Sequence, residues 1–175
     1  MPITSLADLR TGALVELIGS DEISPGAGAA GAVTLALGAA CGAKAVAVSL
    51  KHSPENARLH TALIRLETLR DCALLGADVD TREFADVVRL RTERGAQALA
   101  QTGEAMTHLI EELLLIVEEV EHHVRPNMAG DLIAAKALAT AARAIQSANE
   151  AEAIVEQRAL AKPFPSPEAR DDLPE

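Results

Sequence analysis

The chain has 175 residues, of which 49% are hydrophobic and only 1% aromatic, and its formal net charge is −10. This length predicts one domain that buries roughly 70% of the surface of the unfolded chain. With two Phe and no Trp or Tyr, the core must consist of Leu, Ala, Val and Ile, a composition that favours helices over strands. The acidic balance argues against nucleic acid as a partner, because phosphate contacts need clustered Lys and Arg. We therefore expect an all-α protein that binds no nucleic acid.

The first ten residues lack the basic and apolar regions of a signal peptide. Cys41 and Cys72 lie in apolar stretches with helical character, which is typical of buried thiols in a reducing compartment. Residues 23–43 form an uncharged run long enough for a membrane span. This run is mostly Ala and Gly and has no aromatic belt or Lys/Arg-rich flank. We therefore expect a cytoplasmic protein in which the run is a core helix and no membrane is bound.

The first predicted elements are a short helix and a long one. Ser5 has the hydroxyl of an N-cap, and the helix that it opens is expected to end near Ile18. A polar loop follows, and a long helix is predicted over 27–50. Ser53 and Pro54 then supply an N-cap hydroxyl and a proline at the first helical position, which predicts that a new helix begins there.

After Pro54, apolar residues recur at helical spacing as far as Val88. A break is predicted within 91–97, then a helix that ends before Pro126, and a last helix from Ala129 to about Arg158. Four of the eight prolines lie in the final segment. We therefore expect a single helical domain over residues 1–160, an up-and-down bundle of about five to six helices, and a disordered, acidic, Pro-rich tail over 161–175.

Residues 26–31 spell G-x-G-x-x-G, the phosphate-binding fingerprint of dinucleotide-binding domains. That fingerprint needs a preceding strand and an acidic residue roughly 20 positions further on. Here a polar loop precedes it, and Lys51 occupies the place of the acid. The sequence therefore excludes a dinucleotide site.

Glycines nevertheless gather on one face of this long helix, at positions 28, 31, 38 and 42. A glycine inside a helix costs about 0.5–1 kcal/mol relative to alanine, so the stripe requires a compensating gain. Either another helix packs with its backbone very close, or a flat ligand lies against the exposed backbone. The loop Ser24-Pro25-Gly26 leads into the helix start, where free backbone N–H groups suit an anion or a carbonyl oxygen.

Three segments, in order, resemble the formimidoyltetrahydrofolate cyclodeaminase / methenyltetrahydrofolate cyclohydrolase family. Residues 25–29, PGAGA, resemble its PGGGS helix entry, although one glycine and the hydroxyl are absent. The segment LLGADVDTREFADV resembles its D-A-D-x-x-x-F element, and NMAGDLIAAKALATAARAIQSAN resembles its N-x-x-x-D-L…A-A…N element. The resemblance implies a homodimeric helical bundle. It also implies Asp80 as the proton acceptor, and substrate contacts at Ser24, Pro25, Gly26, Gly28, Asp78, Asn127, Asp131 and Asn149.

The sequence itself leaves two interpretations of Asp80 open. If one helix runs from Pro54 through residue 90, Asp80 projects onto the inward stripe of Ala73, Ala77, Phe84 and Val88. A carboxylate there is costly unless it is paired or functional. Alternatively, a new helix begins at this point, with Asp80 as its N-cap and Glu83 completing a capping box. Capping is likewise the ordinary role for Asn127 and Asp131 near a helix start.

The resemblance implies one of two reactions: cyclodeamination of 5-formimidoyltetrahydrofolate to 5,10-methenyltetrahydrofolate, or hydrolysis of the methenyl bridge. A tetrahydrofolate derivative is then the substrate, and no prosthetic group is expected. Glu119 and His122 form a single E-x-x-H without the second copy that a bundle di-metal site needs, so we expect no metal.

The glutamate carboxylates of a folate require local basic residues, for which Lys44 and Lys51 are candidates. The alternative is that these two lysines belong to an ordinary solvated helix end. The alternative to an enzyme is a non-catalytic helical-bundle binding or assembly module that has lost turnover, consistent with Ala27 and Ala29 in PGAGA.

Overall fold

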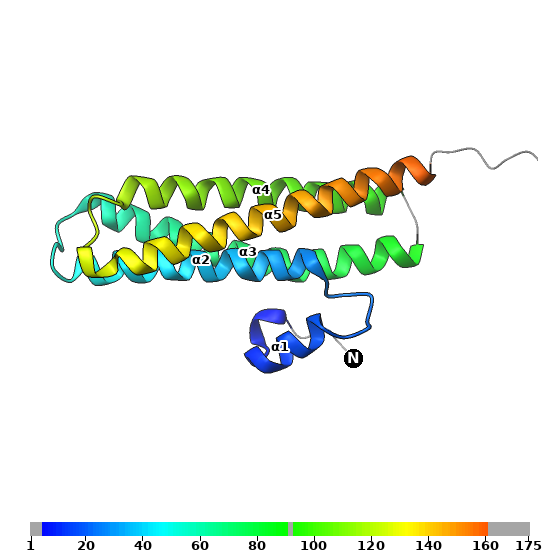
Figure 1. Cartoon of the computed structure of the whole chain (residues 1–175), viewed down its shortest axis with the longest axis horizontal. Coiled ribbons are helices and arrows are strands. Elements are labelled where there is room, and N and C mark those ends of the chain that lie inside the picture. The colour runs from blue at the N-terminus through cyan, green and yellow to red at the C-terminus, as the bar shows by residue number, and fades with distance from the viewer. Residues whose placement is uncertain (1–4, 91–92, 161–175) are drawn as a thin grey trace, which may run out of the picture.

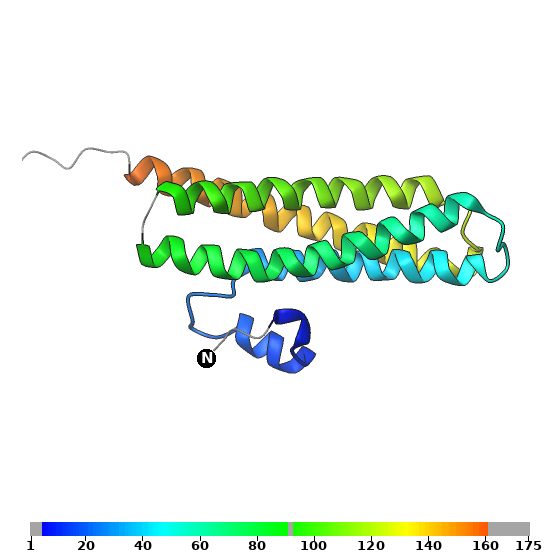
Figure 2. The ribbon, with the colours of Figure 1, turned by 180° about the vertical axis from the view of Figure 1, so that it is seen from behind.

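Four long helices form an antiparallel bundle in the computed structural model, which describes residues 5–90 and 93–160 (Figures 1 and 2). They are α2 (Ala27–Leu50), α3 (Ala57–Leu90), α4 (Glu93–Val120) and α5 (Ala129–Leu160). A short 3-10 helix, η1 (Leu6–Asp8), and helix α1 (Thr11–Ile18) precede the bundle, and a second 3-10 helix, η2 (Pro126–Met128), leads into α5. The described residues contain no β-strand, so the all-α prediction is confirmed.

Helix α2 is the central element, because it packs along both α3 and α5 while α4 contacts those two helices from the far side. Three of its glycines are at close helix contacts. A Cβ on Gly31 would lie 3.1 Å from Ile145, one on Gly38 would lie 3.2 Å from the carbonyl oxygen of Ala135, and one on Gly42 would lie 3.2 Å from Leu66. Close helix packing, and not a flat ligand, therefore explains the glycines at these three positions.

The hydrophobic core between the helices is aliphatic, as the composition predicts. Its fully buried large side chains are Leu35, Val46, Leu59, Leu66, Leu69, Ile110, Leu113, Ile116 and Val120. Alanines fill the narrow contacts between them, and Ala29, Ala39, Ala73, Ala77 and Ala135 are 0% exposed. Small side chains at helix contacts allow the backbones to approach closely and still leave few voids.

The structure corrects several predicted helix ends. Ser5 caps only the short η1, and α1 is a separate helix that begins at Thr11. Helix α3 begins at Ala57 and not at Pro54, because the Asn56 side chain accepts hydrogen bonds from the N–H groups of Arg58 and Leu59. The break predicted within 91–97 is confirmed, since α3 ends at Leu90 and α4 begins at Glu93. The predicted tail, 161–175, lies outside the described residues.

Two predictions of burial are also wrong. Phe84 and Val88 are 38% and 40% exposed, and they lie in the last turns of α3, which extend past the start of α2 (Figure 2). Cys41 is only half-buried and Cys72 is exposed, so neither is the buried thiol that the apolar stretches suggested.

Helix α2 is the one helix in the described part of the chain that is long and apolar enough to cross a membrane, with a mean hydropathy of 1.7. Core helices of globular proteins meet the same criterion, and 13 residues of α2 are buried inside the bundle. Its composition therefore does not indicate a membrane protein, in agreement with the prediction of a core helix.

Candidate active site at the start of helix α2

Asp80 lies in the interior of α3 and not at a helix start, since α3 is continuous over Ala57–Leu90. The capping-box interpretation is therefore wrong. The half-buried carboxylate faces the first turn of α2, where it accepts a hydrogen bond from the backbone N–H of Ala29. A Cβ on Gly28 would lie 2.5 Å from the carboxyl carbon of Asp80. Glycine at position 28 thus leaves the space that the carboxylate occupies.

Burial raises the pKa of Asp80 from its usual 3.8 to about 6. The hydrogen bond from Ala29 lowers the pKa, and the negative charge of Glu83 raises it. A carboxyl group with a pKa near neutral can both accept and return a proton at physiological pH. This property distinguishes a group suited to proton transfer from an ordinary surface carboxylate.

The start of α2 provides further hydrogen-bond donors. Its N-cap is Gly26, which offers no side chain to the free N–H groups of the first turn. Such N–H groups, together with the helix dipole, favour a negative charge or a carbonyl oxygen nearby. The carboxylate of Asp80 is one such acceptor, and a bound ligand is another.

Ser24, Pro25 and Gly26 connect this helix start to α3. The Ser24 hydroxyl donates a hydrogen bond of 2.8 Å to the carbonyl oxygen of Thr81, the residue after Asp80. Pro25 is buried and Gly26 is half-buried. The predicted loop residues therefore do lie beside Asp80, and Ser24 fixes the loop to the helix that carries it.

Asp78 has a clear structural role. Its carboxylate accepts hydrogen bonds from the Ser5 hydroxyl at 2.6 Å and from the Leu6 N–H at 2.7 Å. Both donors belong to the start of η1, 72 or more positions away in the sequence. Asp78 thus attaches the N-terminal segment to α3. Its predicted contact with substrate stays a prediction.

Asn149 lies at the same end of the bundle. Gly31 of α2 contacts Ile145 of α5, and Gly38 contacts Leu138, so the two antiparallel helices place residue 28 opposite residues 148 and 149. The side chain of Asn149 is half-buried. The bundle therefore brings Asn149, Gly28 and Asp80 to one end, from three different helices.

The remaining predicted residues lie at the opposite end. Lys44 forms an ion pair of 3.1 Å with Asp131, in the first turn of α5. Asn127, within η2, accepts a hydrogen bond of 3.4 Å from Arg125. At 1.5 Å per residue, Lys44 and Lys51 are roughly 24 and 35 Å along α2 from Gly28. Within one chain, the predicted substrate residues therefore form two separate groups.

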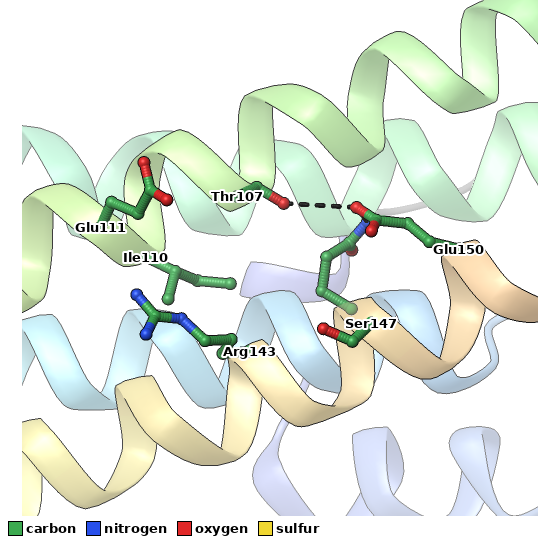
Figure 3. A pocket seen from close by; sticks show the side chains of 7 residues that line it. Thr107, Ile110, Glu111, Arg143, Ser147 and Glu150 are labelled. Atoms are coloured by element: carbon green, nitrogen blue, oxygen red, sulfur yellow. Dashed lines mark hydrogen bonds between the residues drawn. The ribbon is translucent and has the colours of Figure 1, made fainter.

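A surface hollow of about 250 Å³ lies between α4 and α5 (Figure 3). It is lined by Thr107, Ile110, Glu111, Arg143, Gln146, Ser147 and Glu150. Glu150 accepts hydrogen bonds from Thr107 at 3.4 Å and from Gln146 at 3.1 Å. No sequence motif singled out these residues. The hollow opens on the α4–α5 side, whereas Asp80 lies between α3 and α2.

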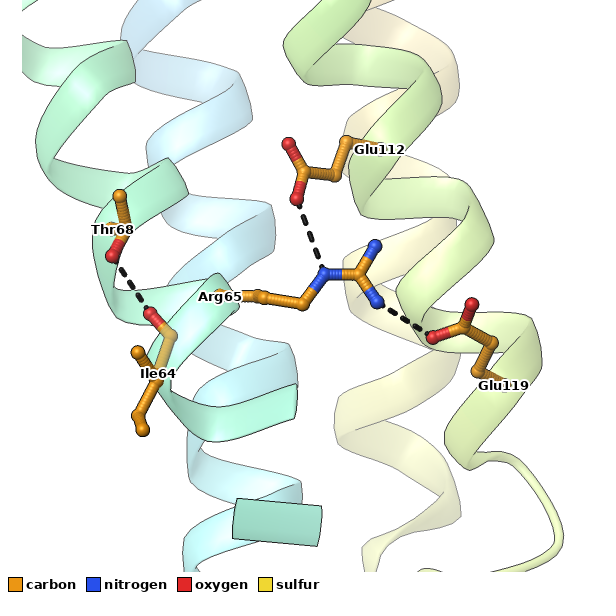
Figure 4. A network of polar contacts seen from close by, with 5 residues as sticks. All are labelled: Ile64, Arg65, Thr68, Glu112 and Glu119. Carbon is orange, nitrogen blue, oxygen red and sulfur yellow. Dashed lines mark hydrogen bonds and ion pairs between the residues drawn. The ribbon is translucent and has the colours of Figure 1, made fainter. Parts of the chain in front are cut away.

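Glu119 of the E-x-x-H pair is bonded to an arginine of α3. Glu119 accepts a hydrogen bond of 2.8 Å from Arg65, and Glu112 accepts one of 3.3 Å from the same guanidinium (Figure 4). Arg65 thereby links α3 to two turns of α4. In the described residues, no three His, Cys, Asp or Glu side chains lie close enough together to hold a metal ion.

Comparison with known families decides what kind of chain this is. The model of the formiminotransferase-cyclodeaminase family matches residues 10–150, well over half of the sequence. The chain belongs to the formiminotransferase-cyclodeaminase family. The resemblance inferred from PGAGA, the Asp78–Phe84 element and the Asn127–Asn149 element is thus confirmed.

The bundle of this cyclodeaminase-family chain is similar to a solved structure. The crystal structure of formiminotetrahydrofolate cyclodeaminase from Thermotoga maritima matches it with a TM-score of 0.77. The match covers 86% of this chain and 81% of that one, at 18% sequence identity. At this identity the likeness establishes the helical-bundle fold. A search of curated proteins gives no match.

Two neighbours of Asp80 were missed by sequence reasoning. The donor at Ala29 is a backbone N–H, and because almost every residue type has one, the sequence gives no sign of this contact. The sequence indicates Glu83 only as a capping partner, yet its negative charge raises the pKa of Asp80, and it accepts a hydrogen bond of 2.5 Å from Thr102 of α4. Its distance of three residues from Asp80 on a continuous helix was the available signal.

The contact between Gly28 and Asp80 gives a first prediction. We expect Gly28→Ala to lower turnover by on the order of tenfold to a hundredfold, because the new methyl group displaces the carboxylate and small misplacements of catalytic groups are costly. The bundle should remain folded, since only the end of one side chain must move. Gly130→Ala is the matched control, because a Cβ at Gly130 meets nothing within 4 Å. Unchanged turnover in Gly28→Ala, measured against Gly130→Ala, would contradict the importance of this contact.

Proposed function

We propose that this protein is a folate one-carbon enzyme that converts 5-formimidoyltetrahydrofolate to 5,10-methenyltetrahydrofolate and ammonia. Membership of the formiminotransferase-cyclodeaminase family supports the substrate class. The single observation that carries the proposal is Asp80, a half-buried carboxyl group with a pKa raised to about 6, held against the first turn of α2. We also propose that the protein acts as a homodimer.

In the proposed reaction, N10 of the substrate attacks the formimidoyl carbon, whose imino nitrogen is protonated, and forms the new carbon–nitrogen bond, while the carbon–nitrogen double bond becomes a single bond to an amino group. The carboxylate of Asp80 accepts the proton that N10 carries. Asp80 then returns this proton to the amino group on the same carbon, and that group leaves as ammonia. The remaining electron pair on nitrogen completes the methenyl bridge, so that no oxidant or reductant is needed. A pKa between those of an ordinary carboxylate and an amine suits both transfers.

The first turn of α2 has a complementary role in this proposal. Its free N–H groups favour acceptor oxygens and negative charge, so they suit a polar edge of the substrate while Asp80 meets the reacting nitrogen. Ser24 keeps the loop in place through its bond to Thr81. Asn149, half-buried at the same end, offers a side-chain amide that can both donate and accept.

The test is direct observation of the product. Purified protein is mixed with 5-formimidoyltetrahydrofolate, and methenyl formation is followed by its longer-wavelength absorbance while released ammonia is assayed separately. The absence of Trp and Tyr gives the protein a low ultraviolet background. Coupled formation of both products supports cyclodeamination. Loss of added 5,10-methenyltetrahydrofolate without use of the formimidoyl compound would instead identify a cyclohydrolase, and folate binding without turnover would identify a binding module.

A further inference from the structure

A second carboxylate lies one turn from Asp80 on α3. Glu83 is half-buried, as Asp80 is, and residues three apart on a continuous helix are neighbours, with Cβ atoms about 5–6 Å apart. The negative charge of Glu83 raises the pKa of Asp80, so the two carboxylates are close enough to interact. Glu83 therefore belongs to the same end of the bundle as the proposed reaction.

Each of the two carboxylates is held by a different helix. Asp80 accepts a hydrogen bond from the backbone N–H of Ala29 in α2. Glu83 accepts one of 2.5 Å from the hydroxyl of Thr102 in α4, and Thr102 is half-buried. A carboxylate can accept about four hydrogen bonds, so both groups are oriented by the bundle and can still accept a hydrogen bond from a ligand.

Neither carboxylate has a cationic partner in the part of the chain that the structure describes. None of the ion pairs there includes Asp80 or Glu83. Arg82, between them in the sequence, is exposed and donates from Nε to the backbone carbonyl of Asp78. Helix α2 carries no charged residue before Lys44. Two half-buried like charges without a counter-ion are unfavourable, and a cationic group bound beside them would offset their repulsion.

The substrate of the proposed reaction carries such a cationic group. Its formimidoyl carbon is bonded to N5 and to an imino nitrogen, which together form an amidine, and amidines are protonated at neutral pH. In 5-formyltetrahydrofolate an oxygen atom replaces this imino nitrogen, and the group is neutral. The two folates therefore have nearly the same shape and differ in the charge and hydrogen-bonding character of one atom.

We propose that Glu83 is a specificity-determining residue of this site, where its carboxylate accepts a hydrogen bond from the protonated imino nitrogen and so selects a formimidoyl folate over a formyl folate. This inference rests on the proposed function. N10 and the imino nitrogen meet at the same carbon during the reaction, and two carboxylates one helical turn apart can each meet one of these nitrogens. Thr102 is a positioning residue, because it acts by holding Glu83.

The place of Glu83 also fits the departure of ammonia. The amino group that Asp80 protonates is the former imino nitrogen, so it leaves from beside the carboxylate of Glu83. A negative charge there favours the positive charge that develops on this nitrogen before the carbon–nitrogen bond breaks. The proton still comes from Asp80, and no bond to Glu83 forms or breaks.

The first experiment compares the binding of these two folates. The Kd values of 5-formimidoyltetrahydrofolate and 5-formyltetrahydrofolate are measured by calorimetry in an Asp80→Asn background, so that no turnover occurs. We expect the formimidoyl compound to bind on the order of tenfold to a hundredfold more tightly, the usual scale for a hydrogen bond to a charged group. Adding Glu83→Gln should remove this preference and leave the Kd of the formyl compound unchanged, because Gln keeps the size of Glu and loses its charge.

Asp86→Asn, in the same background, is the matched control. Asp86 lies one turn further along α3 and is exposed, so this variant removes one negative charge from the same helix and should keep the preference. The proposal is overturned if the formimidoyl compound binds no more tightly while Glu83 is present, or if Glu83→Gln keeps the preference. Equal weakening of both folates by Glu83→Gln would show a structural role and would overturn it as well.

Thr102 is tested by its two closest replacements, again in the Asp80→Asn background. Thr102→Val keeps the shape of the side chain but removes the hydroxyl that donates to Glu83, and we expect it to reduce the formimidoyl preference. Thr102→Ser keeps a hydroxyl and should retain the preference. The same preference in both variants would overturn the positioning role of Thr102.

Turnover by the parent chain separates this inference from the proposed function. If the parent forms no methenyl product, yet formimidoyl binding depends on Glu83, the proposed function fails and the specificity role stands. If the parent turns over and the preference does not depend on Glu83, the proposed function stands and the specificity role is wrong. Failure of the parent to bind either folate would overturn both.

Discussion

Asp80→Asn is expected to lower turnover at least a hundredfold while leaving the bundle folded. General acid–base groups contribute about a hundredfold to ten-thousandfold, and an amide can neither accept the N10 proton nor return it to the leaving nitrogen. The fold should survive, because Asn keeps the size of Asp and removes the cost of a half-buried charge. Turnover is measured by methenyl absorbance, and folding by circular dichroism.

Asp78→Asn is the matched control for this variant. The two carboxylates are two residues apart on α3, yet Asp78 is bonded to Ser5 and Leu6. We expect a loss of less than tenfold in turnover, together with a looser N-terminal segment. If the two variants lose the same activity, or if Asp80→Asn simply melts the protein, Asp80 is not the proton-transfer group.

The pH dependence of turnover follows from the same carboxyl group. Asp80 acts first as a base, so its ionised form is required, and its pKa is about 6. Activity should therefore be full above this value and fall about tenfold for each pH unit below it. The residual activity of Asp80→Asn should lack this fall. A parent profile that stays flat down to pH 4.5 would contradict the assignment.

The central part of the fold was predictable from the sequence because its signals are local. The loop Ser24-Pro25-Gly26 and the uncharged run after it gave the bounds 27–50 of α2, which the structure reproduces. The helical spacing of apolar residues across Asp80 also favoured one continuous helix. The start of α3 was harder to predict, because several nearby polar side chains could cap it. Asn56 is the capping residue, and Ser53 is not.

The candidate site was predictable only in part, because its contacts are long-range. The motifs indicated Asp80 and Gly28 separately, but the steric relation between them appears only once α2 and α3 are packed. The role of Asp78 depends on Ser5, 73 residues away. The placement of Lys44 beside Asp131 depends on how α2 meets α5. A single sequence carries no local signal for such pairs.

Gly38→Leu is the substitution with the largest expected effect on stability. A Cβ at this position would lie 3.1 Å from Leu113, 3.2 Å from the carbonyl oxygen of Ala135 and 3.2 Å from Leu138. The carbonyl group of Ala135 belongs to the backbone of α5 and cannot rotate away as a side chain can. The three carbon atoms of Leu beyond Cβ therefore require α2 and α5 to separate. Overpacking of this kind costs typically about 1–3 kcal/mol and occasionally more, and the contacts at Gly38 belong at the upper end.

For a domain of this size, about 3 kcal/mol corresponds to a fall in Tm of roughly 6–12 °C. Thermal unfolding of Gly38→Leu is compared with that of Gly130→Leu, whose Cβ enters open space and whose Tm should stay within a few degrees of the parent. Gly31→Leu should fall between the two, because its nearest neighbour, Ile145, is a side chain that can change rotamer. Equal Tm values for Gly38→Leu and Gly130→Leu would show that α2 and α5 do not meet at Gly38. The close backbone contact that explains the glycine stripe would then be wrong, and a bound flat ligand would again be the better explanation.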